Sequence, residues 1–137
     1  MNKKNFLVIL VIVILLSIGI TSITYSFYII KETKELDVIL KVDDKVGLNV
    51  DSDAVKFGKV PPGGSGQRTI SLKNNHNTPL KVDIRFSGEV RYFVHVSDNY
   101  FWLEPQETKE ITAVAHVPKD TEFGIYTGKM RVLFKTT

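Results

Sequence analysis

The sequence predicts an all-β fold, an antiparallel β-sandwich of about seven or eight strands preceded by one transmembrane helix. An apolar run without any charge occupies residues 6–30. From Leu36 onward, apolar and polar residues alternate with a period of two, which is the spacing of half-buried strands. The alternating segments are short and are separated by turn-forming stretches such as PPGGSG and PKDTEFG. Because each such strand has one apolar face to bury, two packed antiparallel sheets are the expected architecture.

The apolar run Phe6–Ile30 predicts a transmembrane helix that follows a short N-terminal tail, residues 1–5. As a helix it would extend roughly 37 Å at about 1.5 Å per residue, enough to cross a hydrocarbon core of about 30 Å with some tilt. Tyr25, Phe27 and Tyr28 lie at its far end, where aromatic side chains concentrate at a membrane interface. The lipid bilayer is therefore the partner expected for this segment.

The orientation of this helix is not determined by charge alone. Lys3 and Lys4 precede the apolar run, but Lys31 and Lys34 follow it closely. A short lysine-bearing tail ahead of an apolar run is the layout of an export signal. We therefore expect a single-pass protein of the cell membrane, with a cytoplasmic N-terminus and an extracytoplasmic C-terminal domain. A cleaved signal peptide is the alternative, although no A-x-A-like cleavage site stands out.

Residues 31–35 are expected to form a juxtamembrane linker, and residues 36–137 are expected to form the β domain. Each predicted strand shows the period of two or a β-branched and aromatic composition. The predicted strands are Leu36–Val42, Val46–Val50, Ile70–Leu72, Leu80–Phe86, Val90–Val96, Ile111–Val117 and Tyr126–Phe134, with a further strand-like run ahead of PPGGSG. Phe86, Leu103 and Tyr126 are predicted core positions.

The glycine cluster at Gly63, Gly64 and Gly66 invites comparison with a phosphate-binding loop. Such a loop works because its glycines lead into the N-terminus of a helix. Here they lead into QRTISLK, which has strand periodicity, and the Gly-Lys-Ser/Thr ending of the Walker pattern is missing. PPGGSG is therefore predicted to be a loop between two strands, and no nucleotide partner is expected.

Four consecutive stretches carry a family resemblance: FGKVPPGGSGQRTISLKNN, PLKVDI, FWLEPQETKEITAVAHVP and GIYTGKMRV. Their order resembles the small Ig-like domains of prokaryotic envelope proteins, including those of archaeal membrane proteins, over about residues 46–134. The resemblance implies an Ig-like β-sandwich that acts as a spacer, scaffold or binding module. In the tyrosine-corner arrangement of such domains a hydroxyl anchors a loop backbone, and Tyr126 is the matching residue here.

Catalytic and metal-binding patterns are not found in the sequence. His76, His95 and His116 are far apart, without H-x-H or H-E-x-x-H spacing, and there is no cysteine. The acidic stretch Asp51–Asp53 lacks the glycine and glutamate of an EF-hand loop. The net charge of +3 is mild, and its lysines and arginines are dispersed among acids. We expect no enzyme activity, no cofactor, no metal, no basic stripe and no nucleic-acid partner.

One cluster is a candidate binding surface. In DNYFWLEP, inward-facing Phe101 and Leu103 would turn Tyr100 and Trp102 outward. Two exposed aromatic rings can stack on a sugar or anchor a protein, whereas a buried Trp102 would simply cap the core. The expected function is a non-enzymatic structural, adhesive or scaffolding role at the cell envelope, with an envelope protein or surface glycan as partner. The alternatives are a carbohydrate-binding module, or a subunit of a cell-surface appendage or strand-exchange assembly that uses Leu36–Val42.

Overall fold

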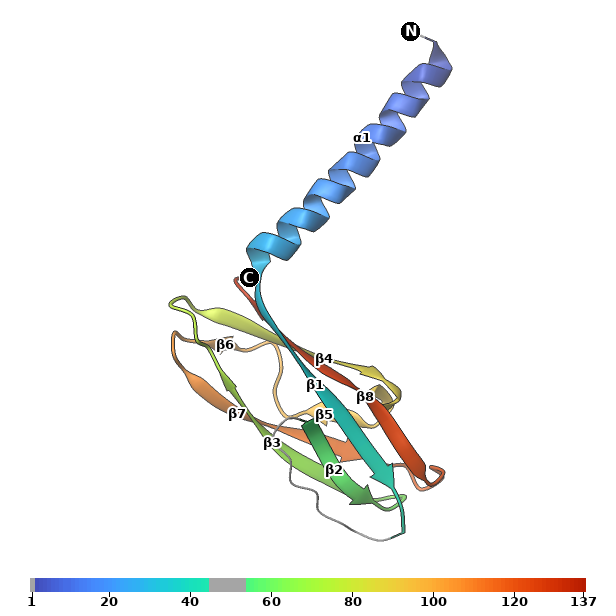
Figure 1. The fold of residues 1–137 in the computed structure, drawn as a ribbon, viewed down its shortest axis with the longest axis vertical. Coiled ribbons are helices and arrows are strands. Elements are labelled where there is room, and N and C mark those ends of the chain that lie inside the picture. The colour runs from blue at the N-terminus through green and yellow to red at the C-terminus, as the bar shows by residue number, and fades with distance from the viewer. Residues whose placement is uncertain (1, 45–53) are drawn as a thin grey trace.

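The chain is described here by a computed structural model that covers residues 2–44 and 54–137 (Figure 1). An N-terminal helix leads into eight strands that form two sheets. The elements are α1 (Lys3–Thr24), the π-helical turn η1 (Tyr25–Ile29), β1 (Ile30–Val42), β2 (Ala54–Val60), β3 (Ser65–Lys73), β4 (Leu80–Gly88), the 3-10 helix η2 (Glu89–Tyr92), β5 (Val94–Val96), β6 (Trp102–Leu103), β7 (Thr108–His116) and β8 (Gly124–Lys135).

The five-stranded sheet has the order β2-β1-β8-β4-β6, and the three-stranded sheet has the order β3-β7-β5. Every described strand pair is antiparallel except β1–β2, which is parallel, with Asp37 opposite Ala54. The expectation of a purely antiparallel fold is therefore wrong for this pair. A parallel pair cannot be joined by the two-residue hairpin that connects antiparallel neighbours.

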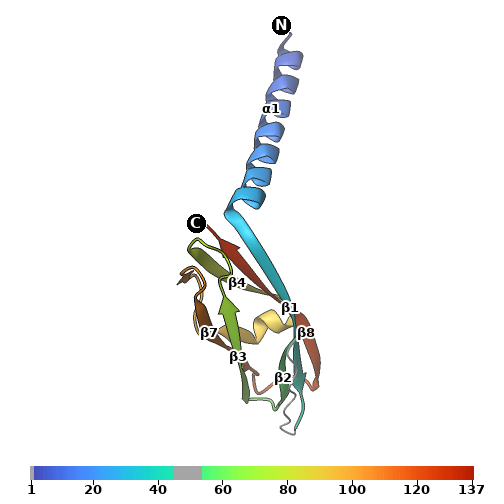
Figure 2. The same ribbon diagram turned by 60° about the vertical axis from the view of Figure 1, so that its left-hand side comes forward.

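The hydrophobic core lies between the two sheets, which face each other in Figure 2. Side chains from both sheets are fully buried in it. The largest are Phe134, Leu40, Leu80, Leu103, Ile111 and Met130. Among the predicted core positions, Leu103 is fully buried, whereas Phe86 and Tyr126 are partly buried and pack against the core. The Tyr126 ring meets that of Phe93 edge-on, with centroids 4.9 Å apart.

The predicted helix is present: α1 and η1 together run from Lys3 to Ile29 and are long and apolar enough to cross a membrane. No residue of this helix is buried against the β domain. The predicted linker, residues 31–35, is instead part of β1 and pairs with β8. The Thr136 N–H also donates a hydrogen bond to the Ile29 carbonyl at 2.9 Å. The helix thus passes into the sheet without a flexible spacer.

Five predicted strands are confirmed as parts of β1, β3, β4, β7 and β8. The predicted strand Val90–Val96 is wrong over its first half, because η2 precedes the short β5 there. Gly88 explains the change, since its φ of 78° turns the chain out of β4. The predicted strand Val46–Val50 and the acidic stretch Asp51–Asp53 lie outside the described residues.

PPGGSG is confirmed as a loop between strands, because it connects β2 to β3. Gly63 has a φ of 80°, which glycine adopts without strain. The Gly64 N–H closes the turn by donating to the Pro61 carbonyl at 2.9 Å, and the Gly63 N–H donates to the Val117 carbonyl at 2.8 Å. The residues after the glycines form a strand, so no helix N-terminus faces this loop.

Candidate functional site

The candidate aromatic residues lie at the end of the β domain that adjoins the helix. Trp102 lies in β6 opposite Lys81 of β4, and Lys81 in turn lies opposite Lys135, near the end of β8. The side chain of Trp102 is 51% exposed and that of Tyr100 is 61% exposed, while the neighbouring Leu103 is fully buried. The outward orientation of both aromatic side chains is thus what the structure shows.

Asn99 holds the loop that carries Tyr100. Its side-chain oxygen accepts hydrogen bonds from the N–H groups of Ile84 and Tyr100, at 2.8 and 2.9 Å. Its side-chain nitrogen donates to the Ile84 carbonyl at 2.8 Å. These hydrogen bonds connect the loop to β4. The backbone of Tyr100 is in the left-handed region, with a φ of 58°. The sequence alone does not single out Asn99, because asparagine is common in turns and the nearby residues do not show that its side chain will bond to Ile84.

A second asparagine joins two other loops at the same end of the domain. Asn74 is fully buried, and its side-chain nitrogen donates to the carbonyls of Thr78, Leu103 and Glu104 at 2.8, 3.1 and 3.2 Å. Its side-chain oxygen accepts from the His76 N–H at 2.9 Å. Buried amides are stable only when their polar atoms are paired, so Asn74 keeps the segment around Trp102 in place.

A buried carboxylate lies on the same outer side of the sheet. Asp83 of β4 is 2% exposed although its position in the alternation points it away from the core. Its Oδ2 lies 2.6 Å from Lys135 Nζ and 2.7 Å from Arg85 Nη2. The charge of Asp83 is therefore compensated by two cations, as a buried carboxylate requires.

The contacts among Asp83, Arg85 and Lys135 shift the pKa values of these side chains. Burial raises the pKa of Asp83, but the hydrogen bonds from Arg85 and Lys135 outweigh burial and leave that pKa below its ordinary value. The hydrogen bond to Asp83 raises the pKa of Lys135, and the Tyr25 hydroxyl adds to this in the same direction. Tyr25 also acts on Arg85, as does Tyr100.

Asp83→Asn is expected to remove part of the acid sensitivity of the β domain. The folded pKa of Asp83 is below its unfolded value of about 3.9, so the carboxylate stabilises the fold above about pH 4. This contribution is lost as pH falls through the folded pKa, with a slope of at most about 1.4 kcal/mol per pH unit. Denaturant unfolding of the full chain between about pH 2 and pH 7 measures it.

The control for this experiment is Asp37→Asn, since Asp37 lies on the same side of the sheet, is exposed and makes no ion pair with another described residue. The difference in unfolding free energy between the natural protein and Asp83→Asn should shrink toward low pH. Asp37→Asn removes the same charge from an exposed position and is compared with the natural protein at the same pH values. Equal pH profiles for both variants would contradict the role of Asp83.

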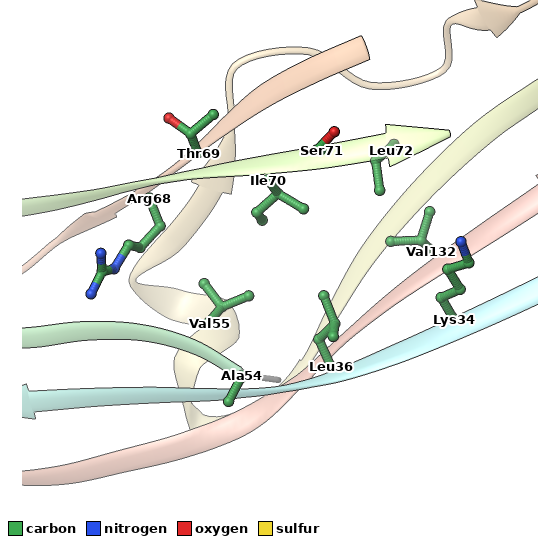
Figure 3. A pocket seen from close by; sticks show the side chains of 10 residues that line it. All are labelled: Lys34, Leu36, Ala54, Val55, Arg68, Thr69, Ile70, Ser71, Leu72 and Val132. Carbon is green, nitrogen blue, oxygen red and sulfur yellow. The ribbon is translucent and has the colours of Figure 1, made fainter. Parts of the chain in front are cut away.

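A pocket of about 440 Å³ opens between the two sheets, where β3 faces β1 and β2 (Figure 3). Aliphatic side chains point into it from both sheets: Leu36, Val55, Ile70, Leu72 and Val132. Lys34 and Arg68 lie at its two ends, and Thr69 and Ser71 point away from it. Among the described residues, its lining contains no carboxylate, histidine or cysteine, so these residues offer no acid–base pair.

The start of β1 carries charges on its inward side. Lys34 Nζ lies 3.4 Å from Glu32 Oε1 and 5.5 Å from the centroid of the Phe134 ring. Glu32 Oε2 is also 3.2 Å from His76 Nε2. Inward-pointing charges beside an unpaired strand edge oppose the addition of a foreign strand. Further along, Leu36–Val42 pairs with β8 on one side and, from Asp37, with β2 on the other. The strand expected to be available for exchange is therefore already paired.

Within the described residues, no group of three or more histidine, cysteine, aspartate or glutamate side chains is close enough to hold a metal ion. His95 and His116 are exposed on the three-stranded sheet, and His76 lies at the opposite end of the domain from the β2–β3 turn. The three histidines are thus not brought together.

Comparison with protein-family models, with curated proteins and with solved structures finds no match.

Proposed function

We propose that this protein is a single-pass membrane protein whose β domain has a non-enzymatic structural, adhesive or scaffolding role at the cell envelope. The observation that carries the proposal is the junction between α1 and β1. An apolar helix of which no residue is buried against the β domain is unfavourable in water and favourable in a bilayer. The helix continues directly into a strand that is paired along its length.

The length of the helix supports a position of the β domain close to the bilayer. About 20 residues span the hydrocarbon core, so a helix that enters it near Phe6 leaves it near Tyr25. Tyr25 and Tyr28 then lie at the level of the lipid headgroups, where such rings are favoured. Strand β1 begins at Ile30, so a partner of this domain would be reached at the membrane surface.

We further propose that the β domain is an Ig-like sandwich. Two sheets enclose one core, and the Tyr126 hydroxyl donates a hydrogen bond to the Glu122 carbonyl at 2.9 Å, an anchor comparable to the tyrosine corner. Domains of this kind serve as spacers and binding modules, and an envelope protein or surface glycan is the partner we propose. The exposed Tyr100 and Trp102 favour a carbohydrate-binding module as the second candidate.

Membrane insertion and orientation can be tested by cysteine labelling, because the natural chain has no cysteine and gives no background. Asp120→Cys places a thiol in the exposed loop before β8, and Asn2→Cys places one at the start of the helix. With an extracytoplasmic domain, a membrane-impermeant maleimide should label Asp120→Cys in intact cells. It should label Asn2→Cys only after lysis.

The reverse labelling pattern would contradict the orientation and leave the spanning helix intact. Extraction of the chain from membranes by alkaline carbonate would contradict the spanning helix itself. A shortened intact mass, with cleavage between about Ser17 and Phe27, would show a signal peptide instead of an anchor.

A further inference from the structure

The two sheets differ in the charge of their outer faces. Strand alternation turns many charged side chains of the five-stranded sheet away from the core. The basic ones are Lys31, Lys41, Lys56, Lys59, Lys81, Arg85, Lys129, Arg131 and Lys135, and the acidic ones are Glu35, Asp37 and Asp83, with Asp43 adjoining β1. We call this surface the basic face; among the described residues its basic side chains outnumber its acidic ones by five, against a net charge of +3 for the whole chain. The outer face of the three-stranded sheet carries only Lys73 and Glu110 in its described strands, apart from its histidines.

Three of the four carboxylates of the basic face are each shared by two cations, whereas Asp37 makes no ion pair with another described residue. Glu35 Oε1 lies 2.6 Å from Arg131 Nη2, and Glu35 Oε2 lies 3.5 Å from Lys129 Nζ. Asp43 lies 3.3 and 3.8 Å from the Nζ atoms of Lys59 and Lys41. Asp83 is shared by Arg85 and Lys135 in the same way. Internal pairing therefore neutralises only part of the positive charge.

Two further lysines of the basic face have no ion-pair partner among the described residues. They are Lys31, at the start of β1, and Lys81, which is opposite Trp102. Both lie at the helix-proximal end, where Trp102 and Tyr100 are exposed. Cationic side chains interleaved with exposed Trp and Tyr are the composition expected of a surface that meets lipid headgroups.

The orientation of the basic face relative to α1 also supports a contact with lipid headgroups. In Figures 1 and 2, β1 turns away from the helix axis, and the five-stranded sheet lies on the side of the domain toward α1. The three-stranded sheet lies on the far side. The pairing of Ile30 with Lys135 and the hydrogen bond from the Thr136 N–H to the Ile29 carbonyl independently place the end of the helix beside this sheet.

We propose that the basic face lies against the membrane that holds the helix and binds the phosphates of anionic phospholipids, with Trp102 and Tyr100 at headgroup level. This proposal rests on the spanning helix of the proposed function, and it applies to either leaflet. The polar outer face of the three-stranded sheet is then turned away from the bilayer. Trp102 and Tyr100 become membrane contacts, which distinguishes this arrangement from a carbohydrate-binding site.

Trp102 is the only tryptophan of the chain and reports directly on this contact. The full chain is reconstituted in vesicles of phosphatidylcholine alone or with about 30% phosphatidylglycerol, each containing a lipid spin-labelled at its headgroup. We expect blue-shifted and strongly quenched Trp102 emission in the anionic vesicles at about 0.1 M salt. Raising salt to about 1 M shortens the Debye length from about 10 to about 3 Å, so the additional quenching over phosphatidylcholine should disappear.

The test variant is Lys31→Glu with Lys81→Glu, which breaks no ion pair between described residues. The matched control is Lys73→Glu with Lys119→Glu, which changes net charge equally on exposed residues away from the basic face. A lysine near an anionic surface contributes about 1 kcal/mol, or about fivefold in the ratio of contacting to detached domains. The test variant should lose quenching accordingly and the control should keep it.

Insertion is verified in the same vesicles by resistance to alkaline carbonate, and folding by circular dichroism. A chain that is extracted contradicts the proposed function, and with it this inference. A chain that is inserted and folded, but whose Trp102 quenching is the same in both vesicles and unchanged by salt or by the test variant, overturns the lipid contact alone. Equal losses in the test and control variants would also overturn it, because they would show a general charge effect.

Discussion

Gly128→Ala is expected to destabilise the β domain by about 3 kcal/mol or more, a large part of the roughly 5–15 kcal/mol that stabilises a domain of this size. Gly128 lies in β8, opposite Gly88 of β4. A Cβ atom at Gly128 would lie 2.1 Å from the Ser87 carbonyl oxygen and 2.4 Å from a methyl carbon of Val90. The carbonyl is backbone, so relief of this overlap requires β4 or β8 to shift. Denaturant unfolding of the full chain in detergent, followed by circular dichroism, measures the loss.

Gly124→Ala is the matched control in the same strand. The nearest atom to a Cβ there is Cε2 of Tyr126 at 3.9 Å, which is an ordinary contact, and the backbone of Gly124 does not need a positive φ. Its effect should stay within about 0.5 kcal/mol. If Gly128→Ala were as mild as Gly124→Ala, the close approach of β4, η2 and β8 described here would be wrong.

Leu103→Ala and Trp102→Ala are expected to differ strongly although the residues are adjacent in β6. Leu103 is fully buried between the sheets, so its truncation should cost about 2–5 kcal/mol. Trp102 is 51% exposed, and its truncation should change the unfolding free energy by under about 1 kcal/mol. The same measurements of circular dichroism against denaturant compare the two variants without relying on tryptophan fluorescence.

The two variants also separate the contribution of Trp102 to binding from its contribution to the stability of the fold. Trp102→Ala should leave the fold intact while it weakens whichever contact the exposed ring makes, because an exposed aromatic anchor commonly contributes more than its neighbours. A stability loss for Trp102→Ala as large as that for Leu103→Ala would place the ring in the core. The proposals that use Trp102 as a contact residue would then lose their main support.

Those parts of the structure that depend on local patterns were predictable from the sequence. The apolar run 6–30 is long enough, and free enough of charge, to predict a membrane-spanning helix without knowledge of the rest of the fold. The structure has this helix at Lys3–Ile29. The alternation in Leu80–Phe86 marks both a strand and its buried side. Alternation also predicted that Leu103 is buried, whereas the choice between an outward Trp102 and one that caps the core is made by the structure, in which Trp102 is exposed. Each of the predicted features is determined by residues within a few positions of one another.

Features that depend on which strands become neighbours were not predictable in this way. The parallel pairing of β1 with β2, the incorporation of residues 31–35 into β1, and the buried Asp83 all arise from contacts between distant segments. Lysines and arginines are dispersed among acidic residues along the chain, as predicted. In the folded domain, however, many of them lie on the basic face. Alternation shows on which side of its own strand a lysine lies, but not which other strands share that side.

The sequence by itself thus determined one apolar helix and the strands with their inward residues, and it left open whether Trp102 is exposed or buried. Only the tertiary structure decided that Lys81, Lys135 and Trp102 lie side by side, because the pairing of β4 with β6 and β8 joins residues far apart in the chain. It also decided that this row adjoins the end of the helix, because β1 pairs with β8 from its first residue. Local periodicity carries no information on strand order, which follows from how all the apolar faces are buried together.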